Sequence, residues 1–286
     1  MIEWYYFALI SSILLGVYSV VEKLALKNEH ATAFTSAFSI IAAAMSLPLL
    51  LFANFDLTYM QLFLIFANGT IMALTYLLAA RIFKHGSISV ASAAFGSLPS
   101  VFVALLAIPL LGEHLTVLQY VSIAVISVII YLLLFERGLG KDFESNKYRI
   151  MVLVRSLLVA MQAVLTKYLL GSVDVPTLLF LCEIFMAFDF AVFISVKYGG
   201  IKEIVFTIRS YALPIILMAA LTVGFSLTYF LSLTGADVSL VTPVRNTVYV
   251  VMAVILGGML FNEDELKKKL ALSAILLIFT YLLIAA

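Results

Sequence analysis

Charged residues and cysteine are both scarce in this sequence. Asp, Glu, Lys and Arg make up 12% of the 286 residues, whereas about a quarter is usual in soluble domains. The formal net charge is only +1, so no basic surface predicts nucleic acid as a partner. The single cysteine, Cys182, cannot form a disulfide within the chain, which excludes a disulfide-stabilised scaffold.

The motifs of common enzymes and cofactor sites are also missing. The chain contains no GxxxxGK(S/T) loop for ATP, no CxxC pair and no HExxH zinc motif. All three histidines fall in the expected polar connections, at His30, His85 and His114. We therefore expect no enzyme, no catalytic residues, no cofactor and no metal site.

Long apolar runs dominate what is present. Hydrophobic residues make up 64% of the chain, and its mean hydropathy is +1.17. Windows of about 20 apolar residues, the length of a membrane-spanning helix, recur between short polar connections. Strands of a membrane barrel would be half as long and would alternate in polarity. The sequence predicts an all-α integral membrane protein with ten transmembrane helices in a lipid bilayer. The windows are approximately 4–26, 31–53, 58–82, 87–111, 115–135, 150–170, 175–197, 211–233, 237–261 and 267–285.

Short patterns recur in the same order in the two halves of the chain. The matched pairs are Lys23 and Lys167 at an offset of 144, and Ser89 and Ser239, Glu113 and Glu263 at an offset of 150. We predict two five-helix repeats, 1–140 and 146–286. Because five spans is an odd number, the second repeat would enter the membrane from the opposite side, as in many secondary transporters. The alternative is that hydrophobic segments simply resemble one another.

The order of these motifs resembles the EamA-like ten-helix transporters of the drug/metabolite transporter (DMT) superfamily. The resemblance rests on Gly16…Lys23, Gly86-Ser-Ile-Ser-Val-Ala-Ser…Pro99, Leu111-Gly-Glu113 and Ser239-Leu-Val-Thr-Pro243…Phe261-Asn-Glu263. It implies a carrier for a small metabolite, with a cavity between the halves lined by the first four helices of each repeat. The fifth helix of each repeat would be peripheral. One departure is that Leu15, not tryptophan, precedes Gly16.

Ionisable residues inside the apolar windows are the strongest indication of a functional site. Arg245 lies about 12 Å below the expected membrane surface, where a charge is costly unless something compensates it. Glu183 lies at a matching depth, whereas Asp189 and Arg155 lie toward the opposite face. We predict the ion pairs Glu183–Arg245 and Asp189–Arg155. Such pairs either pin neighbouring helices or mark a path for a substrate and a coupling proton.

Large hydrogen-bonding side chains near mid-depth are candidates for contact with a substrate. The predicted substrate-binding residues are Arg245, Asn246, Tyr249, Gln162, Asn68 and Tyr76. The predicted gate residues are Lys23, Lys167, Pro99 and Pro243, because the lysines end helices at opposite faces and the prolines can bend helices. The alternatives are ordinary polar contacts between helices, and lysines that reach the membrane surface as anchors.

These patterns favour a secondary active transporter that moves a small organic metabolite, such as an amino acid or organic acid, by alternating access. Arg245 would hold the acidic group, and Glu183 or Asp189 would carry a coupling proton. A multidrug or cation exporter, a channel and a non-transporting membrane scaffold are the alternatives. We expect a multi-pass protein of the cell membrane, and a homodimer is compatible with the sequence. Most Lys and Arg fall in odd-numbered connections, which favours both termini outside the cytoplasm, whereas the family resemblance implies both termini inside.

Overall fold

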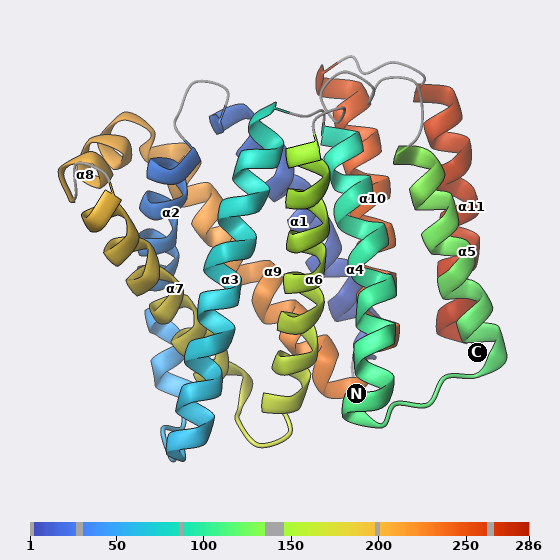
Figure 1. Cartoon of the computed structure of the whole chain (residues 1–286), viewed down its shortest axis with the longest axis horizontal. Coiled ribbons are helices and arrows are strands. Elements are labelled where there is room, and N and C mark those ends of the chain that lie inside the picture. The colour runs from blue at the N-terminus through green and yellow to red at the C-terminus, as the bar shows by residue number, and fades with distance from the viewer. Residues whose placement is uncertain are drawn as a thin grey trace.

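Long helices account for most of the structure (Figure 1). The computed structural model describes residues 3–26, 31–85, 88–134, 146–197, 201–261 and 266–285, and every regular element in these ranges is helical. The elements are α1 (Trp4–Leu26), α2 (Ala31–Ser46), the 3-10 helix η1 (Leu47–Phe52), α3 (Tyr59–His85), α4 (Ile88–Leu111), α5 (Val117–Leu134), α6 (Asn146–Leu169), α7 (Val175–Lys197), α8 (Ile201–Ser210), α9 (Ala212–Gly235), α10 (Val238–Phe261) and α11 (Leu266–Ala285). Glu263, His30 and 135–145, where the predicted repeats would join, lie outside the described residues.

The expected windows locate the long helices to within a few residues, but two details differ. The window 31–53 contains an α-helix that ends at Ser46, and η1 follows it with Pro48 in its first turn. Proline lacks the backbone N–H that would continue the α-helical bonding, which explains the change of helix type. The connection between α7 and α9 also contains the short helix α8, which the apolar windows did not predict.

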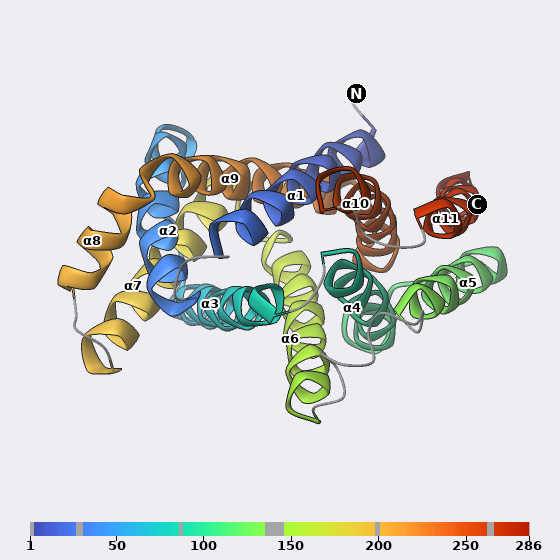
Figure 2. The same ribbon diagram turned by 90° about the horizontal axis from the view of Figure 1, so that it is seen from above.

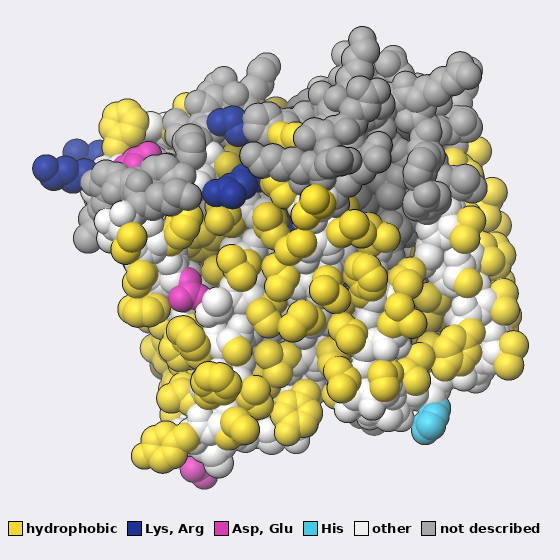
Figure 3. Space-filling model, viewed as in Figure 1, with side chains coloured by type: hydrophobic (Ala, Val, Ile, Leu, Met, Phe, Trp, Pro, Cys, Tyr) yellow, Lys and Arg dark blue, Asp and Glu magenta, His cyan; other side chains and the backbone are white. Residues whose placement is uncertain are grey.

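The described helices are those of a multi-pass membrane protein. Seven of them are long and apolar enough to cross a bilayer: α1, α2 together with η1, α3, α6, α7, α9 and α10. Shorter apolar helical stretches occupy Leu98–Leu111, Val117–Ile129 and Leu270–Ala285, within α4, α5 and α11. Hydrophobic side chains cover much of the face in Figure 3, and the visible Lys and Arg side chains lie near its upper end.

Reciprocal capping explains where two of the helices begin. The backbone N–H of Thr58 donates to the side-chain oxygen of Gln61 at 2.8 Å, and the Gln61 N–H donates to the Thr58 hydroxyl at 3.2 Å. Thr116 and Gln119 make the same two bonds at 2.8 and 3.3 Å. Each pair satisfies two N–H groups at the helix start that have no partner within the helix, so the sequence T-x-x-Q sets the start of α3 and of α5.

The start of α10 is held by a carboxylate from the other half of the chain. The two Glu113 oxygens accept the backbone N–H groups of Val238 at 2.8 Å and of Ser239 at 3.0 Å, and the Ser239 hydroxyl also donates to Glu113. Gly112, at φ +68°, supplies the left-handed turn that separates α4 from this residue. Because a negative charge at a helix N-terminus is stabilising, Glu113 fastens α10 to the end of α4.

The centre of the bundle is formed by α1, α3, α4, α6, α9 and α10. Seen from above, α5 and α11 lie together at one edge and α2, α7 and α8 lie at the other (Figure 2). Between these edges, α1 packs against α9 and α10, and α6 packs against α3 and α4. A Cβ atom at Gly96 would lie 2.6 Å from Val250 Cγ2, so α4 and α10 cross where only a glycine fits.

Candidate substrate-binding cavity

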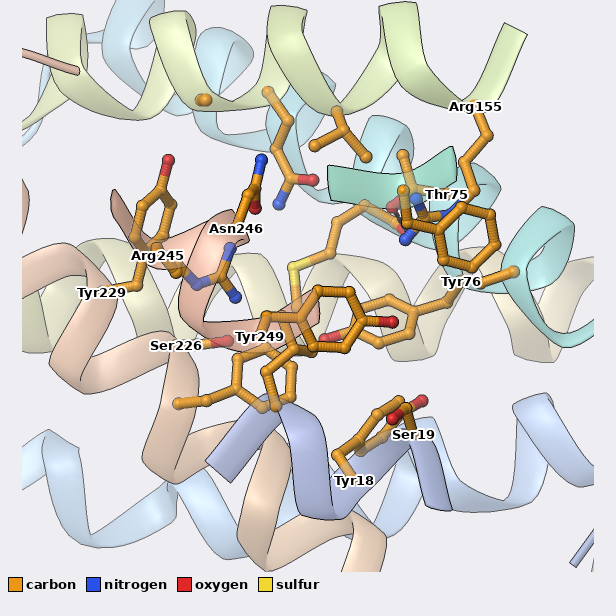
Figure 4. Close-up of a pocket in the computed structure, with 18 of the residues that line it drawn as sticks. Tyr18, Ser19, Thr75, Tyr76, Arg155, Ser226, Tyr229, Arg245, Asn246 and Tyr249 are labelled. Atoms are coloured by element: carbon orange, nitrogen blue, oxygen red, sulfur yellow. Dashed lines mark hydrogen bonds between the residues drawn. The ribbon is translucent and has the colours of Figure 1, made fainter. Parts of the chain in front are cut away.

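A cavity of about 100 Å³ lies among α1, α3, α4, α6, α9 and α10. Its charged lining residues are Glu22, Arg155 and Arg245, and its polar lining also includes Gln162, Asn246, Thr75 and Ser226. Eight aromatic residues line it as well: Tyr18, Tyr76, Phe83, Phe95, Phe225, Tyr229, Phe230 and Tyr249. Figure 4 shows Arg245 with Tyr229 and Asn246, and Arg155 on the other side of the view.

Helices α2 and α7 do not contribute to this lining, although the family resemblance implied that they would. The ring of Phe38 on α2 packs edge-on against Tyr18 and Tyr76, at 6.3 and 5.3 Å between ring centroids. Both tyrosines line the cavity. They therefore separate α2 from it, and the cavity is narrower than expected on this side.

Arg245 projects from α10 toward α1 and α9. Its Nε donates a hydrogen bond to the Ser11 hydroxyl at 2.9 Å. Its guanidinium carbon lies 4.3 Å from the centroid of the Tyr229 ring and 5.5 Å from that of Phe225. The tyrosine hydroxyl in turn shares a 3.0 Å hydrogen bond with Thr242. An aromatic face and a hydroxyl thus hold the cation in place, and neither carries an opposite charge.

Arg155 enters the same cavity from α6. Its guanidinium carbon lies 3.5 Å from the centroid of the Phe95 ring, a close cation–π contact. Its Nε and Nη1 have no hydrogen-bond partner. The acidic residue whose charge acts on it is Glu22, from α1. A guanidinium that stacks on a ring through its face still has N–H groups along its edge, and these can donate hydrogen bonds to an anionic group.

The two predicted ion pairs are not formed in this structure. Both carboxyl oxygens of Glu183 are buried without a hydrogen-bond partner, as is Oδ2 of Asp189. Matching depth had suggested these pairs, but depth does not fix the direction in which a side chain points around its helix. Arg245 turns to Ser11 and Tyr229, Arg155 turns to Phe95, and neither acidic residue of α7 lines the cavity.

Five of the six predicted substrate-binding residues line the cavity: Arg245, Asn246, Tyr249, Gln162 and Tyr76. Two of them are tied to α4, since the Asn246 amide donates to the Ser100 hydroxyl at 3.1 Å and the Tyr249 hydroxyl donates to Ser92 at 2.8 Å.

Asn68 is different, because it does not line the cavity. It is fully buried, and its amide donates to the Thr166 hydroxyl at 3.0 Å and to Cys182 Sγ at 3.4 Å. It joins α3 to α6 and α7.

None of the predicted gate residues lines the cavity. The Lys23 and Lys167 ammonium groups donate to backbone carbonyls at the ends of α3 and α9. Pro99 and Pro243 lie inside α4 and α10, which continue through them. Whether any of the four acts as a gate stays a prediction.

Sequence reasoning missed Glu22. This residue is only 2% exposed and lines the cavity, yet it directly precedes Lys23, and in the sequence this pair of charges resembles a polar helix end. A signal was present in the spacing: Leu15, Tyr18, Ser19 and Glu22 follow one face of a helix, and all four line the cavity.

Among the described residues, no three His, Cys, Asp or Glu side chains gather as a metal site would require.

Comparison with known proteins found one matching family and a similar solved structure. Residues 2–135 match the sequence profile of the EamA-like transporter family, a family of membrane transporters. The resemblance inferred from the motifs is thereby confirmed over residues 2–135, and it is consistent with the DMT superfamily.

No curated protein matches the chain significantly. A solved structure described only as "Crystal structure of protein" is similar at 14% sequence identity and a TM-score of 0.71, covering 97% of this chain and 94% of the other. At this identity the similarity establishes a shared fold along nearly the whole chain.

Proposed function

We propose that this protein is a secondary active transporter for a small organic anion, such as an organic acid or an amino acid, with Arg245 as the anchor for its acidic group. One observation carries the proposal. Two guanidinium groups, those of Arg155 and Arg245, line one cavity within the membrane-spanning bundle, and Glu22 is the one carboxyl among the described lining residues. The cavity therefore has a formal charge of +1 when all three are ionised.

Electrostatics explains why this favours an anion. A cation away from water is costly unless it is compensated, and a cation–π contact offsets only a small part of that cost. A substrate carboxylate would supply the missing charge and accept paired N–H donors from a guanidinium. A lipophilic cation, the substrate of a multidrug or cation exporter, would be repelled by the same cavity.

The pattern of helix packing supports two inverted repeats, 1–140 and 146–286. We pair α1 with α6, α2 with α7, α3 with α9, α4 with α10 and α5 with α11, following the sequence offsets. If each helix is replaced by its counterpart in the other repeat, every contact should map onto another contact that is also present. The α1–α9 contact maps onto α6–α3, α1–α10 onto α6–α4, α2–α9 onto α7–α3 and α4–α5 onto α10–α11. All eight of these helix pairs are in contact. A fold with this exchange can open to either side of the membrane by rocking one half against the other, which is the basis of alternating access.

The ten-span topology, the cell membrane as the location and a homodimer stay predictions, as does proton coupling. The sequence suggested Glu183 or Asp189 as the proton carrier. Both lie on α7, which does not line the cavity, so either residue would have to act on the substrate indirectly.

Transport by purified protein in liposomes tests the proposal. Counterflow of radiolabelled pyruvate, succinate and glutamate should reveal exchange of at least one of these anions, whereas a channel or a scaffold gives no counterflow. Arg245→Gln should lower the rate by roughly thirtyfold or more, because losing one partner of a charged contact costs about 2 kcal/mol or more.

The matched control is Arg209→Gln, since Arg209 is exposed on α8. It should leave counterflow unchanged. Transport of lipophilic cations in place of anions, or full activity of Arg245→Gln, would contradict the proposal.

A further inference from the structure

Glu22 is a buried acidic residue in the cavity, so its protonation state sets part of the charge of the cavity. It lies on α1, is 2% exposed, and lines the cavity together with Arg155 and Arg245. Its Oε2 is buried without a hydrogen-bond partner. Leaving an ionised carboxyl oxygen buried and unpartnered is expensive, so binding a proton is one way for this site to lower its free energy.

The ionisable groups around Glu22 come from several helices. Arg155 of α6 is the cation whose charge acts on it. Three tyrosines line the same cavity, namely Tyr18 on its own helix, Tyr76 on α3 and Tyr249 on α10.

The remaining neighbours of α1 add little charge. Helix α9 brings Tyr229 to the cavity, and the described cavity residue of α4 is Phe95, which does not titrate. The adjacent Lys23 directs its ammonium group to the Phe83 carbonyl. Protonation of Glu22 therefore changes the net charge of the cavity, in which Arg155 and Arg245 are the fixed positive charges.

We propose that Glu22 is the proton-binding site of this transporter, and that a proton on Glu22 and an anion in the cavity bind cooperatively. The inference rests on the proposed anion transport and assigns to α1 the coupling group that the sequence had suggested on α7. With Glu22 ionised, the three charges sum to +1, and Glu22 competes with the substrate for Arg155. With Glu22 protonated, the sum is +2, and both guanidinium groups are available to acidic groups of the substrate.

The direction of the effect follows from linkage. Protonating Glu22 strengthens anion binding, so anion affinity should fall as the pH rises through the range in which Glu22 ionises. By reciprocity, binding the anion promotes uptake of a proton from solution at Glu22. Proton and anion are then bound and released together, which is the requirement for moving both in the same direction.

Binding of succinate to the purified protein tests the coupling. Succinate is a suitable probe because its two carboxylates can engage both arginines. Between mildly acidic and mildly alkaline pH, the wild-type affinity should fall by roughly tenfold, within the range of coupled sites. Glu22→Gln should bind succinate tightly across this range and lose the pH dependence. The controls are Glu183→Gln and Asp189→Asn, which should retain it.

A second measurement needs no substrate. In infrared difference spectra between acidic and alkaline pH, the wild type should show a carboxylic-acid carbonyl band that Glu22→Gln lacks and that Glu22→Asp retains at a shifted position. Identical bands in wild type and Glu22→Gln would overturn the proposal, as would an unchanged pH dependence of succinate binding in Glu22→Gln. If the wild type binds no succinate but the Glu22 band is present, the chosen anion class fails while the proton site stands.

Discussion

The Lys23 ammonium group donates a hydrogen bond to the backbone carbonyl of Phe83 at 2.7 Å, which joins α1 to the last turns of α3. The positions at the predicted repeat offsets make the same kind of bond. Lys167 lies 144 residues after Lys23 and donates to the carbonyl of Leu233, which lies 150 residues after Phe83, also at 2.7 Å. A second bond reaches Ala236 at 2.9 Å. Carbonyls at the C-terminal end of a helix have no partner within the helix. Each lysine therefore places a positive charge at the negative end of a neighbouring helix, α3 for Lys23 and α9 for Lys167.

Replacing either lysine should therefore destabilise the protein. Lys23→Met and Lys167→Met keep the length of the side chain and remove the charge and the donor. Each should cost about 1 kcal/mol, the typical contribution of a cation at a helix C-terminus, and lower the melting temperature in detergent. Lys202→Met, at an exposed position on α8, is the control. Unchanged stability combined with lost transport would instead favour the gate role that the sequence suggested.

Glu113 should contribute to stability through its contacts with α10. Glu113→Gln retains the shape of the side chain but cannot accept all three donors from Val238 and Ser239 as a charged carboxylate does. We expect a loss of about 1–2 kcal/mol, measured as a lower melting temperature. Ser239→Ala removes one of these donors, so the double variant should cost less than the two single variants added together. Strict additivity would show that the two residues do not act on each other.

The crossing of α4 and α10 should be sensitive to the smallest added side chain. In Gly96→Ala, the new Cβ would lie 2.6 Å from Val250 Cγ2 and 3.3 Å from the Asn246 carbonyl oxygen. We expect a loss of about 1–3 kcal/mol from overpacking, with partial recovery in the double variant Gly96→Ala/Val250→Ala. Gly112→Ala is an informative comparison, since it meets no atom within 4 Å and suffers only from its positive φ, and Val250→Ala should not rescue it.

The long helices and several residues of the candidate cavity could be predicted from the sequence because membrane helices have a strong signal in composition. An apolar run of about 20 residues has few other structures open to it, so bounds such as those of α1 and α7 follow directly. For the same reason Arg155 and Arg245 stood out, and both line the cavity.

Pairing and orientation could not be predicted in the same way. Depth places a residue along its helix but leaves its rotation about the helix axis open. Glu183 and Arg245 were matched by depth, yet Arg245 faces α1 and α9. Glu22 was missed because a charge beside Lys23 resembles a helix end in water, and only packing shows that it is buried. Asn68 was taken for a cavity residue, whereas its bonds to Thr166 and Cys182 hold helices together.

The contact between Arg245 and Ser11 allows the anchor role to be tested without removing the arginine. At the repeat offsets, Ser11 corresponds to Arg155 and Arg245 corresponds to Phe95. If the proposed repeats are right, the 2.9 Å bond from Arg245 to Ser11 and the 3.5 Å stacking of Arg155 on Phe95 are equivalent contacts, each joining one half of the chain to the other. Each contact holds one cation, supplied by α10 in the first and by α6 in the second, so both cations come from the second half of the chain.

Ser11→Ala should weaken substrate binding while the guanidinium and its charge remain. Without the hydroxyl, Nε loses its partner and the side chain is held only by Tyr229 and Phe225, so its orientation toward the substrate is less well defined. A hydrogen bond to a charged group contributes about 1.5 kcal/mol or more, and we expect the KM of anion counterflow to rise by roughly tenfold with little change in maximal rate. Ser12→Ala is the control, because the Ser12 hydroxyl bonds to Ala8 in its own helix at 2.6 Å, whereas the Ser11 hydroxyl also donates to the Phe225 carbonyl of α9 at 2.8 Å. An equal effect of the two substitutions would mean that Ser11 acts through α1 packing and not through Arg245.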